Sequence, residues 1–121
     1  MPLYESGEDY LEAVLKLSKT KPDVHSVDVA RELGVSKPAV TKALKILSSN
    51  GYIEFDGNHI HLTEEGGAYA ERIYQRHQVI TKFFLLLGVS RENAETDACR
   101  MEHDISDESF AAIEKYIKDN E

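Results

Sequence analysis

Three side chains that can bind metal fall within five residues near the end of the chain. Cys99, Glu102 and His103 lie in the sequence CRMEHD. If this stretch is helical, spacings of three and four residues place the three side chains on one face. A thiolate, a carboxylate and an imidazole on one face suit a transition metal. A catalytic thiol paired with a base is the alternative, but no orienting third group accompanies it, so we expect no enzyme activity and no catalytic residues.

Further ligand types occur in two other predicted helices. Asp9 and Glu12 are three residues apart near the start of the chain, and His77 lies within a long helical pattern. Taken singly, each of these residues fits a solvated charge or a packed side chain. Taken together, six potential ligands from three helices favour a divalent metal site.

The elements that would carry these residues can be read from the hydrophobic pattern. Residues 8–18 and 26–33 have apolar side chains at helical spacing, and Ser26 is a suitable N-cap. Residues 36–50 form a second short helix after a tight glycine turn, which is the helix-turn-helix pattern. Residues 52–62 alternate around an Asp-Gly turn and predict a β-hairpin.

The second half of the chain predicts a helical lobe. Helical patterns cover residues 64–87, 90 to about 103, and 106 onward, and Ser90 and Ser106 are expected N-caps. The predicted fold is therefore mostly α, with an N-terminal winged helix-turn-helix domain at residues 1–63 and a helical domain at residues 64–121. No apolar run approaches the length of a membrane helix, and a single cysteine favours the cytosol.

Charge is distributed unevenly along the chain. The 121 residues carry a formal net charge of −8, which argues against nucleic-acid binding by bulk charge alone. However, no carboxylate lies between Glu32 and Glu54, while three lysines do. This acid-free window coincides with the predicted recognition helix, whose N-terminal residues approach bases and phosphates in such folds. The predicted DNA-binding residues are Ser36, Lys37, Pro38, Ala39, Thr41 and Lys42.

The joint order of these segments resembles the diphtheria toxin repressor and manganese transport regulator family. The resemblance is carried by EDYLEAV, VARELGVSKPAVTKALKIL, IHLTEEGGAYAERIYQRHQVITKFFLLLGV and ACRMEHDIS. It implies a cytoplasmic homodimer that binds a divalent metal, then a palindromic DNA operator, and represses metal-uptake genes. Ile80, Phe83, Phe84 and Leu87 are candidates for the dimer interface. Since the sequence stops at Glu121, we expect it to lack the SH3-like domain of the longer iron-type proteins.

The resemblance also implies a ligand set of mixed type. Asp9, Glu12, His77, Glu102 and His103 match ligands of the manganese-type regulators. Cys99 stands where that type has Glu and the iron type has Cys, and it can ligate through its side chain or its carbonyl oxygen. We expect Mn²⁺, then Fe²⁺, with up to two ions per subunit bridged by Glu102. A metal-independent winged-helix regulator and a Cys99 thiol redox sensor remain alternatives.

Overall fold

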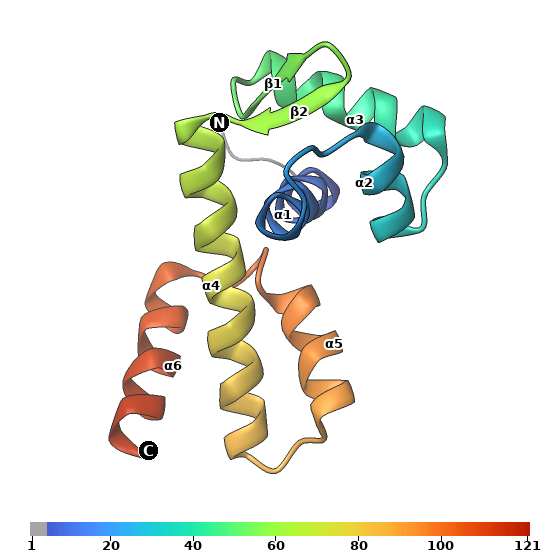
Figure 1. Ribbon diagram of the computed structural model, residues 1–121. Coiled ribbons are helices and arrows are strands. Elements are labelled where there is room, and N and C mark those ends of the chain that lie inside the picture. The colour runs from blue at the N-terminus through green and yellow to red at the C-terminus, as the bar shows by residue number, and fades with distance from the viewer. Residues whose placement is uncertain (1–4) are drawn as a thin grey trace. The chain divides into compact units, whose positions relative to one another are not determined.

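A computed structural model describes residues 5–121 and consists of two compact units. The first extends to Glu71 and the second runs from Arg72 to Glu121. The described elements are α1 (Glu5–Thr20), α2 (Ser26–Leu33), α3 (Lys37–Ser49), β1 (Ile53–Asp56), β2 (His59–Leu62), α4 (Glu64–Leu86), α5 (Arg91–Met101) and α6 (Asp107–Asp119). This order confirms the predicted fold class, and Figure 1 labels each element. No helix within residues 5–121 is long and apolar enough to cross a bilayer.

The first unit is a winged helix-turn-helix. Its core takes apolar side chains from α1, α2, α3 and the hairpin, and the fully buried members are Leu11, Val14, Val29, Val40, Leu44, Leu47, Ile53 and Ile60. Gly34 joins α2 to α3 with a φ of 65°, a left-handed conformation that a side chain would disfavour. The tight turn therefore fixes α3 against α2.

The hairpin forms the wing, and a backbone hydrogen bond ties it to the rest of the unit. β1 and β2 pair antiparallel, with Ile53 opposite Leu62 and Asp56 opposite His59. The backbone N–H of Ile60 donates to the Val24 carbonyl at 2.8 Å, which ties β2 to the segment before α2. The wing is thus held by the same segment that begins the helix-turn-helix.

The start of α2 differs from the sequence prediction by one residue. His25 is the N-cap, and Ser26 is already the first helical residue. The reason is Asp28, whose carboxylate accepts a hydrogen bond from the backbone N–H of His25 at 2.9 Å. An acidic side chain three residues into the helix thereby satisfies the N-cap donor, and the Ser26 hydroxyl is not needed.

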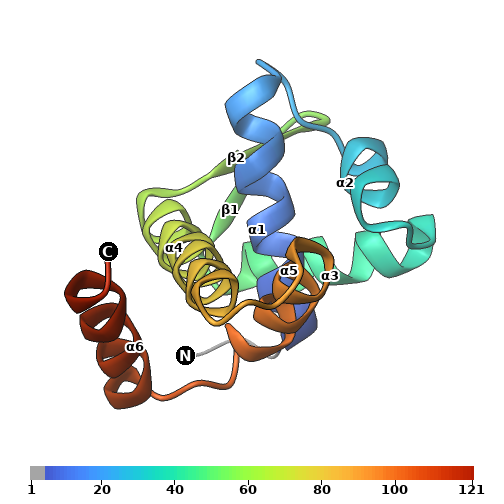
Figure 2. The ribbon, with the colours of Figure 1, turned by 90° about the horizontal axis from the view of Figure 1, so that it is seen from below.

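The second unit contains the last four turns of α4 together with α5 and α6. Figures 1 and 2 show α5 and α6 on opposite sides of this part of α4. Ser90 and Ser106 cap α5 and α6 as predicted, each accepting a backbone N–H on its hydroxyl. Buried apolar side chains of this unit include Ile73, Ile80 and Ile117.

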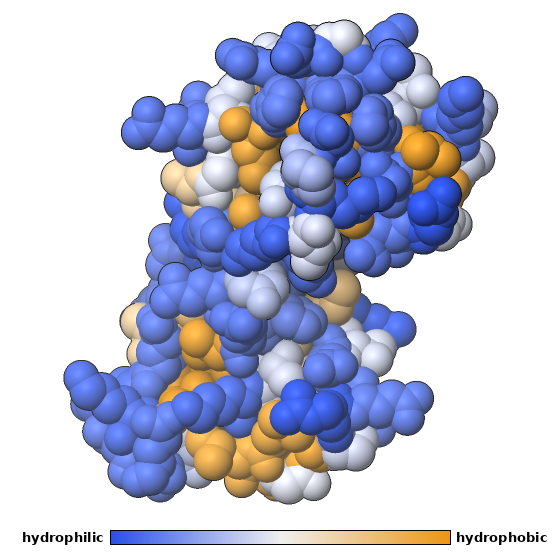
Figure 3. Space-filling model, viewed as in Figure 1, coloured by the Kyte–Doolittle hydropathy of each residue, from blue (hydrophilic) through white to orange (hydrophobic). Residues whose placement is uncertain are grey.

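The predicted dimer-interface residues differ in their exposure. Ile80 is fully buried and belongs to the core of the unit, so it is not available to a partner. Phe83 and Phe84 are half-buried, while Leu86, Leu87 and Tyr116 are exposed. Figure 3 shows apolar atoms gathered where α4 ends.

Candidate metal centre and DNA interface

A buried carboxylate lies between two imidazoles in the second unit. Glu102 is 1% exposed. Its Oε2 is 2.9 Å from Nδ1 of His77, and its Oε1 is 3.5 Å from Nε2 of His103. The side chain of His103 is only 2% exposed. Burying a carboxylate is costly unless a positive charge or strong donors compensate it, and imidazole supplies that charge only when protonated.

The end of α5 explains how this cluster forms. The helix stops at Met101 rather than near His103, and Glu102 is its C-cap residue with helical φ and ψ. Glu102 and His103 therefore follow directly on the last helical turn, and both side chains are buried. Cys99, one turn earlier on α5, is exposed, so the three predicted ligands do not share the same degree of burial.

Arg76 is a residue of this region that the sequence reasoning missed. Its guanidinium donates to the carbonyl oxygen of Ile105 at 2.9 Å and pairs with the carboxylate of Asp107. It also lies over the ring of Phe110, 5.2 Å from the ring centroid. Arg76 thus fastens the segment that follows His103 onto α4. The only sequence signal was an arginine beside His77 in the predicted helix.

The first helix presents the other two predicted ligands. Asp9 and Glu12 both lie on α1; Asp9 is half-buried and Glu12 is 7% exposed. Oε1 of Glu12 pairs with Nζ of Lys16 at 3.4 Å. Its Oε2 is buried and has no hydrogen-bond partner among the described residues. A buried, unsatisfied carboxylate oxygen fits a cation ligand, because leaving it unmatched is unfavourable.

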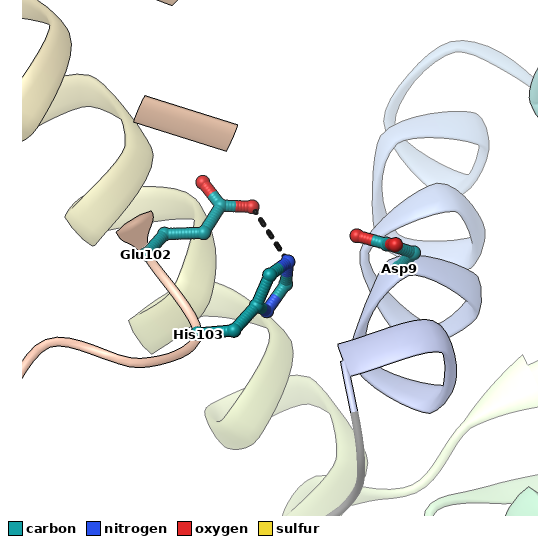
Figure 4. A group of neighbouring side chains, drawn as sticks. All are labelled: Asp9, Glu102 and His103. Carbon is teal, nitrogen blue, oxygen red and sulfur yellow. Dashed lines mark ion pairs between the residues drawn. The ribbon is translucent and has the colours of Figure 1, made fainter. Parts of the chain in front are cut away.

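The donor chemistry of the whole set fits a divalent transition metal. Asp9, Glu102 and His103 each offer one ligand atom of a suitable type, and Figure 4 shows these side chains with the ion pair between Glu102 and His103. Carboxylate oxygens suit Mn²⁺, and imidazole nitrogens suit Fe²⁺, Zn²⁺ and similar ions. The buried carboxylate of Glu102 and the unmatched oxygen of Glu12 distinguish these two acids from solvated surface charges.

The predicted DNA-binding residues lie at the exposed start of α3. All six of them, Ser36, Lys37, Pro38, Ala39, Thr41 and Lys42, are exposed. Among the residues that the structure describes, neither lysine of this group forms an ion pair, so both ammonium groups are available to phosphates. The start of α3, within the acid-free window of the sequence, is thus exposed on the folded unit.

Two hydroxyls of this surface are already engaged in the helix. The Ser36 hydroxyl accepts the backbone N–H of Ala39 at 3.3 Å, which leaves its own O–H free to donate. The Thr41 hydroxyl donates to the carbonyl of Lys37 at 3.0 Å. Ser36 can therefore donate to a phosphate without losing its cap, whereas Thr41 must either accept from a base or turn away from Lys37.

The fold and these surfaces define a winged-helix DNA-binding protein with a helical lobe that carries a carboxylate–imidazole cluster. Residues 2–59 match the family described as iron dependent repressor, N-terminal DNA binding domain. Residues 63–121 match iron dependent repressor, metal binding and dimerisation domain. The chain belongs to this family of metal-dependent transcriptional repressors.

Individual relatives agree with the family. The transcriptional regulator MntR of Escherichia coli O6:H1 is 40% identical over 112 residues, covering 92% of this chain and 72% of its own length. An uncharacterised HTH-type transcriptional regulator of Methanocaldococcus jannaschii is 32% identical over 118 residues, or 94% of each chain.

Solved structures show the same fold. The metal-dependent transcriptional regulator MtsR superposes with a TM-score of 0.86 at 28% identity, and the manganese regulator SloR with 0.83 at 26%. This chain is covered to 93% in both cases, and it spans about half, 53%, of the length of each of those chains.

Proposed function

We propose that the chain is a manganese-responsive repressor that binds a palindromic operator as a homodimer. The observation that carries the metal part is the buried carboxylate of Glu102 between His77 and His103. Supporting it are the family, whose second domain is described as metal binding and dimerisation, and a relative named as a manganese regulator. No catalytic role is proposed.

The proposed ligand set is Asp9, Glu12, His77, Cys99, Glu102 and His103. Mn²⁺ ranks first because three of these six side chains are carboxylates. Fe²⁺ ranks second because an ionised Cys99 would strengthen its binding. This order is the same whether one ion or two are bound per subunit. A bound divalent ion supplies positive charge to acidic groups that come from both units of the chain.

Regulation then follows from where the ligands lie in the sequence. Asp9 and Glu12 belong to the helix that forms the core of the DNA-binding unit, whereas Glu102 and His103 follow α5 in the other unit. When the two groups share one coordination sphere, the recognition helices of the dimer are held at the spacing of successive major grooves, about 34 Å. By linkage, metal and operator strengthen each other's binding by an equal factor, typically about 5- to 150-fold.

The DNA part of the proposal uses the exposed start of α3. Lys37 and Lys42 contact phosphates, Ser36 donates to a phosphate, and Thr41 contacts a base. Pro38 and Ala39 supply apolar contacts to thymine methyl groups. Support comes from the exposure of all six residues and from the absence of ion pairs to the two lysines among the described residues.

The test is a selection of binding sites from random-sequence duplex DNA with the full chain, once with Mn²⁺ and once with EDTA. We expect enrichment of an inverted repeat with Mn²⁺ and none with EDTA. Affinities for the enriched duplex are then compared across Mn²⁺, Fe²⁺ under anaerobic conditions, Co²⁺ and Zn²⁺. Equal affinity with Mn²⁺ and with EDTA would overturn the metal-dependent function, and a site without two-fold symmetry would overturn the homodimeric operator.

Cys99 separates the proposal from a thiol sensor. Because Cys99 is exposed, an oxidant can reach it. In a metal-dependent repressor, Cys99→Ser changes which metal activates best but keeps the response to Mn²⁺. In a thiol sensor, the same substitution abolishes the response of DNA binding to peroxide. Mn²⁺ would then have no effect on DNA binding, either in the wild type or in Cys99→Ser.

A further inference from the structure

Three histidines gather in the first unit, at the start of α2 and on the wing. His25 precedes α2, and His59 and His61 lie on β2. The ring centroids of His25 and His59 are 4.8 Å apart with planes at 89°, and those of His59 and His61 are 6.3 Å apart. His59 and His61 are two residues apart on a strand and so lie on one face of the hairpin.

Two carboxylates flank this histidine cluster. Nδ1 of His59 is 3.0 Å from Oδ1 of Asp23, and Nδ1 of His25 is 3.6 Å from Oδ2 of Asp28. In both rings the Nδ1 side thus faces a carboxylate and Nε2 remains for another partner. Histidines that bind metals usually donate their second nitrogen to a carboxylate or carbonyl, which orients the ring and makes it a better ligand.

We propose that His25 and His59, with His61 as a third ligand, form a second transition-metal site in the DNA-binding unit. The ion is one that prefers imidazole, such as Zn²⁺ or Cu²⁺, rather than the oxygen-seeking Mn²⁺. Asp23 orients the ring of His59, and neither Asp23 nor Asp28 binds the ion. This proposal does not depend on the manganese-responsive function.

The spacing of the rings fits a shared ion. Two imidazoles bound at about 2.0–2.1 Å per nitrogen, with a ligand angle of about 90–110°, place their ring centroids about 4.5–5.3 Å apart. The observed 4.8 Å between His25 and His59 lies in this range. Their side chains are 38% and 39% exposed, so an ion in solvent can reach both rings. His61 is exposed as well, and its ring centroid is 6.3 Å from that of His59.

An ion at this position would strengthen a connection that the backbone already makes. The Ile60 N–H to Val24 carbonyl bond joins the two segments that carry His59 and His25. The three ligands come from the wing and from the residue that begins α2. Binding would therefore restrain the wing relative to the helix-turn-helix, within a unit whose α3 surface is proposed to contact DNA.

The test is equilibrium dialysis of the full chain against Zn²⁺, with bound metal measured by elemental analysis. The double variant H25Q/H59Q is compared with the wild type and with E54Q, a control on β1 in which the exposed carboxylate opposite His61 is neutralised. We expect the double variant to bind one Zn²⁺ fewer per chain, while E54Q keeps the wild-type number. Bound Mn²⁺ should be equal in all three proteins.

A second readout locates the ion. Cu²⁺ added in steps should broaden the imidazole proton resonances of His25, His59 and His61 in the wild type, and the broadening of His61 should be lost in H25Q/H59Q. Unchanged Zn²⁺ stoichiometry in H25Q/H59Q, or equal broadening of His61 in both proteins, would overturn the second site. Neither result bears on Mn²⁺-dependent DNA binding, so the two proposals fail separately.

Discussion

Nδ1 of His77 and Oε2 of Glu102 lie 2.9 Å apart, although the residues are 25 positions apart in the sequence. One side chain comes from the middle of α4 and the other from the cap of α5. The contact shows that the second unit by itself brings together an imidazole and a carboxylate that were predicted as ligands of one metal. Glu102 is also the most deeply buried acid among the described residues.

Replacing Glu102 with Gln should weaken Mn²⁺ binding by at least tenfold. The amide keeps the size and the hydrogen-bonding capacity of the side chain but removes the negative charge that attracts the ion. Isothermal titration calorimetry of the full chain with Mn²⁺ measures the change. Glu108→Gln is the matched control, because Glu108 is an exposed acid in the first turn of α6. Equal affinities in the two variants would exclude Glu102 as a ligand.

Replacing Lys42 with Ala should weaken operator binding at saturating Mn²⁺ and leave metal binding unchanged. The lysine is exposed and forms no ion pair among the described residues, so its loss removes a phosphate contact and little else. The slope of log affinity against log salt concentration should become shallower by about 0.9 for one contact. Fluorescence anisotropy with the selected duplex gives both quantities. Lys115→Ala, on α6, should change neither; an unchanged slope in the Lys42 variant would place this residue outside the interface.

Much of this architecture could be predicted from the sequence because its signals are local. The Asp-Gly turn, the serine caps of α3, α5 and α6, and the apolar periodicity each depend on a few neighbouring residues. The fold class and the helix-turn-helix followed from them.

Features that depend on distant partners were not predictable in the same way. Arg76 binds the carbonyl of Ile105, 29 residues away, and nothing near it in the sequence indicates that bond. The burial of Glu102 and His103 at the end of α5 likewise depends on distant residues such as His77, which a local pattern does not encode. For the candidate metal site, spacing within each helix selected the ligand types, but only the fold shows that Glu102 is buried and Cys99 is exposed.

The free energy of unfolding should decrease at acidic pH, because protonation of Asp28 removes a stabilising interaction. Its side chain is 6% exposed, and a hydrogen bond from Lys21, reinforced by the backbone N–H of His25, lowers its pKa below the ordinary value of 3.8. A carboxyl group with a lowered folded-state pKa stabilises the protein above its unfolded-state pKa and loses that contribution as the pH falls through the folded-state value. This contribution is therefore complete at neutral pH and is lost progressively as the pH falls below about 4.

Urea unfolding of the full chain between pH 2.5 and 7 tests this. Asp28→Asn should be less stable than the wild type at pH 7, and the difference should shrink toward pH 2.5. Asp56→Asn is the control, since Asp56 is an exposed strand residue. A difference for Asp28→Asn that stays constant over the whole pH range would show that the carboxylate charge has no part in stability.

Alanine substitutions at two adjacent glycines near the start of α4 should change the stability of the protein in opposite directions. A Cβ on Gly66 would lie 1.8 Å from the carbonyl oxygen of Tyr52 and 2.7 Å from its carbonyl carbon, whereas a Cβ on Gly67 meets nothing within 4 Å. Since the obstacle at Gly66 is backbone, the helix would have to move away from the segment that enters β1. Gly66→Ala should therefore destabilise the protein by about 3 kcal/mol or more, as large core clashes do.

Gly67→Ala is the matched partner of that variant. It lies in the same helical turn with open space around it, so alanine should increase stability by about 0.5–1 kcal/mol through its higher helix propensity. Thermal and urea unfolding of both variants measure the two effects. The opposite signs are the informative part: helix propensity alone predicts a gain at both positions, and only the close approach of α4 to Tyr52 predicts a loss at Gly66. If both variants gain stability, the wing and α4 do not pack at the distance that the structure shows.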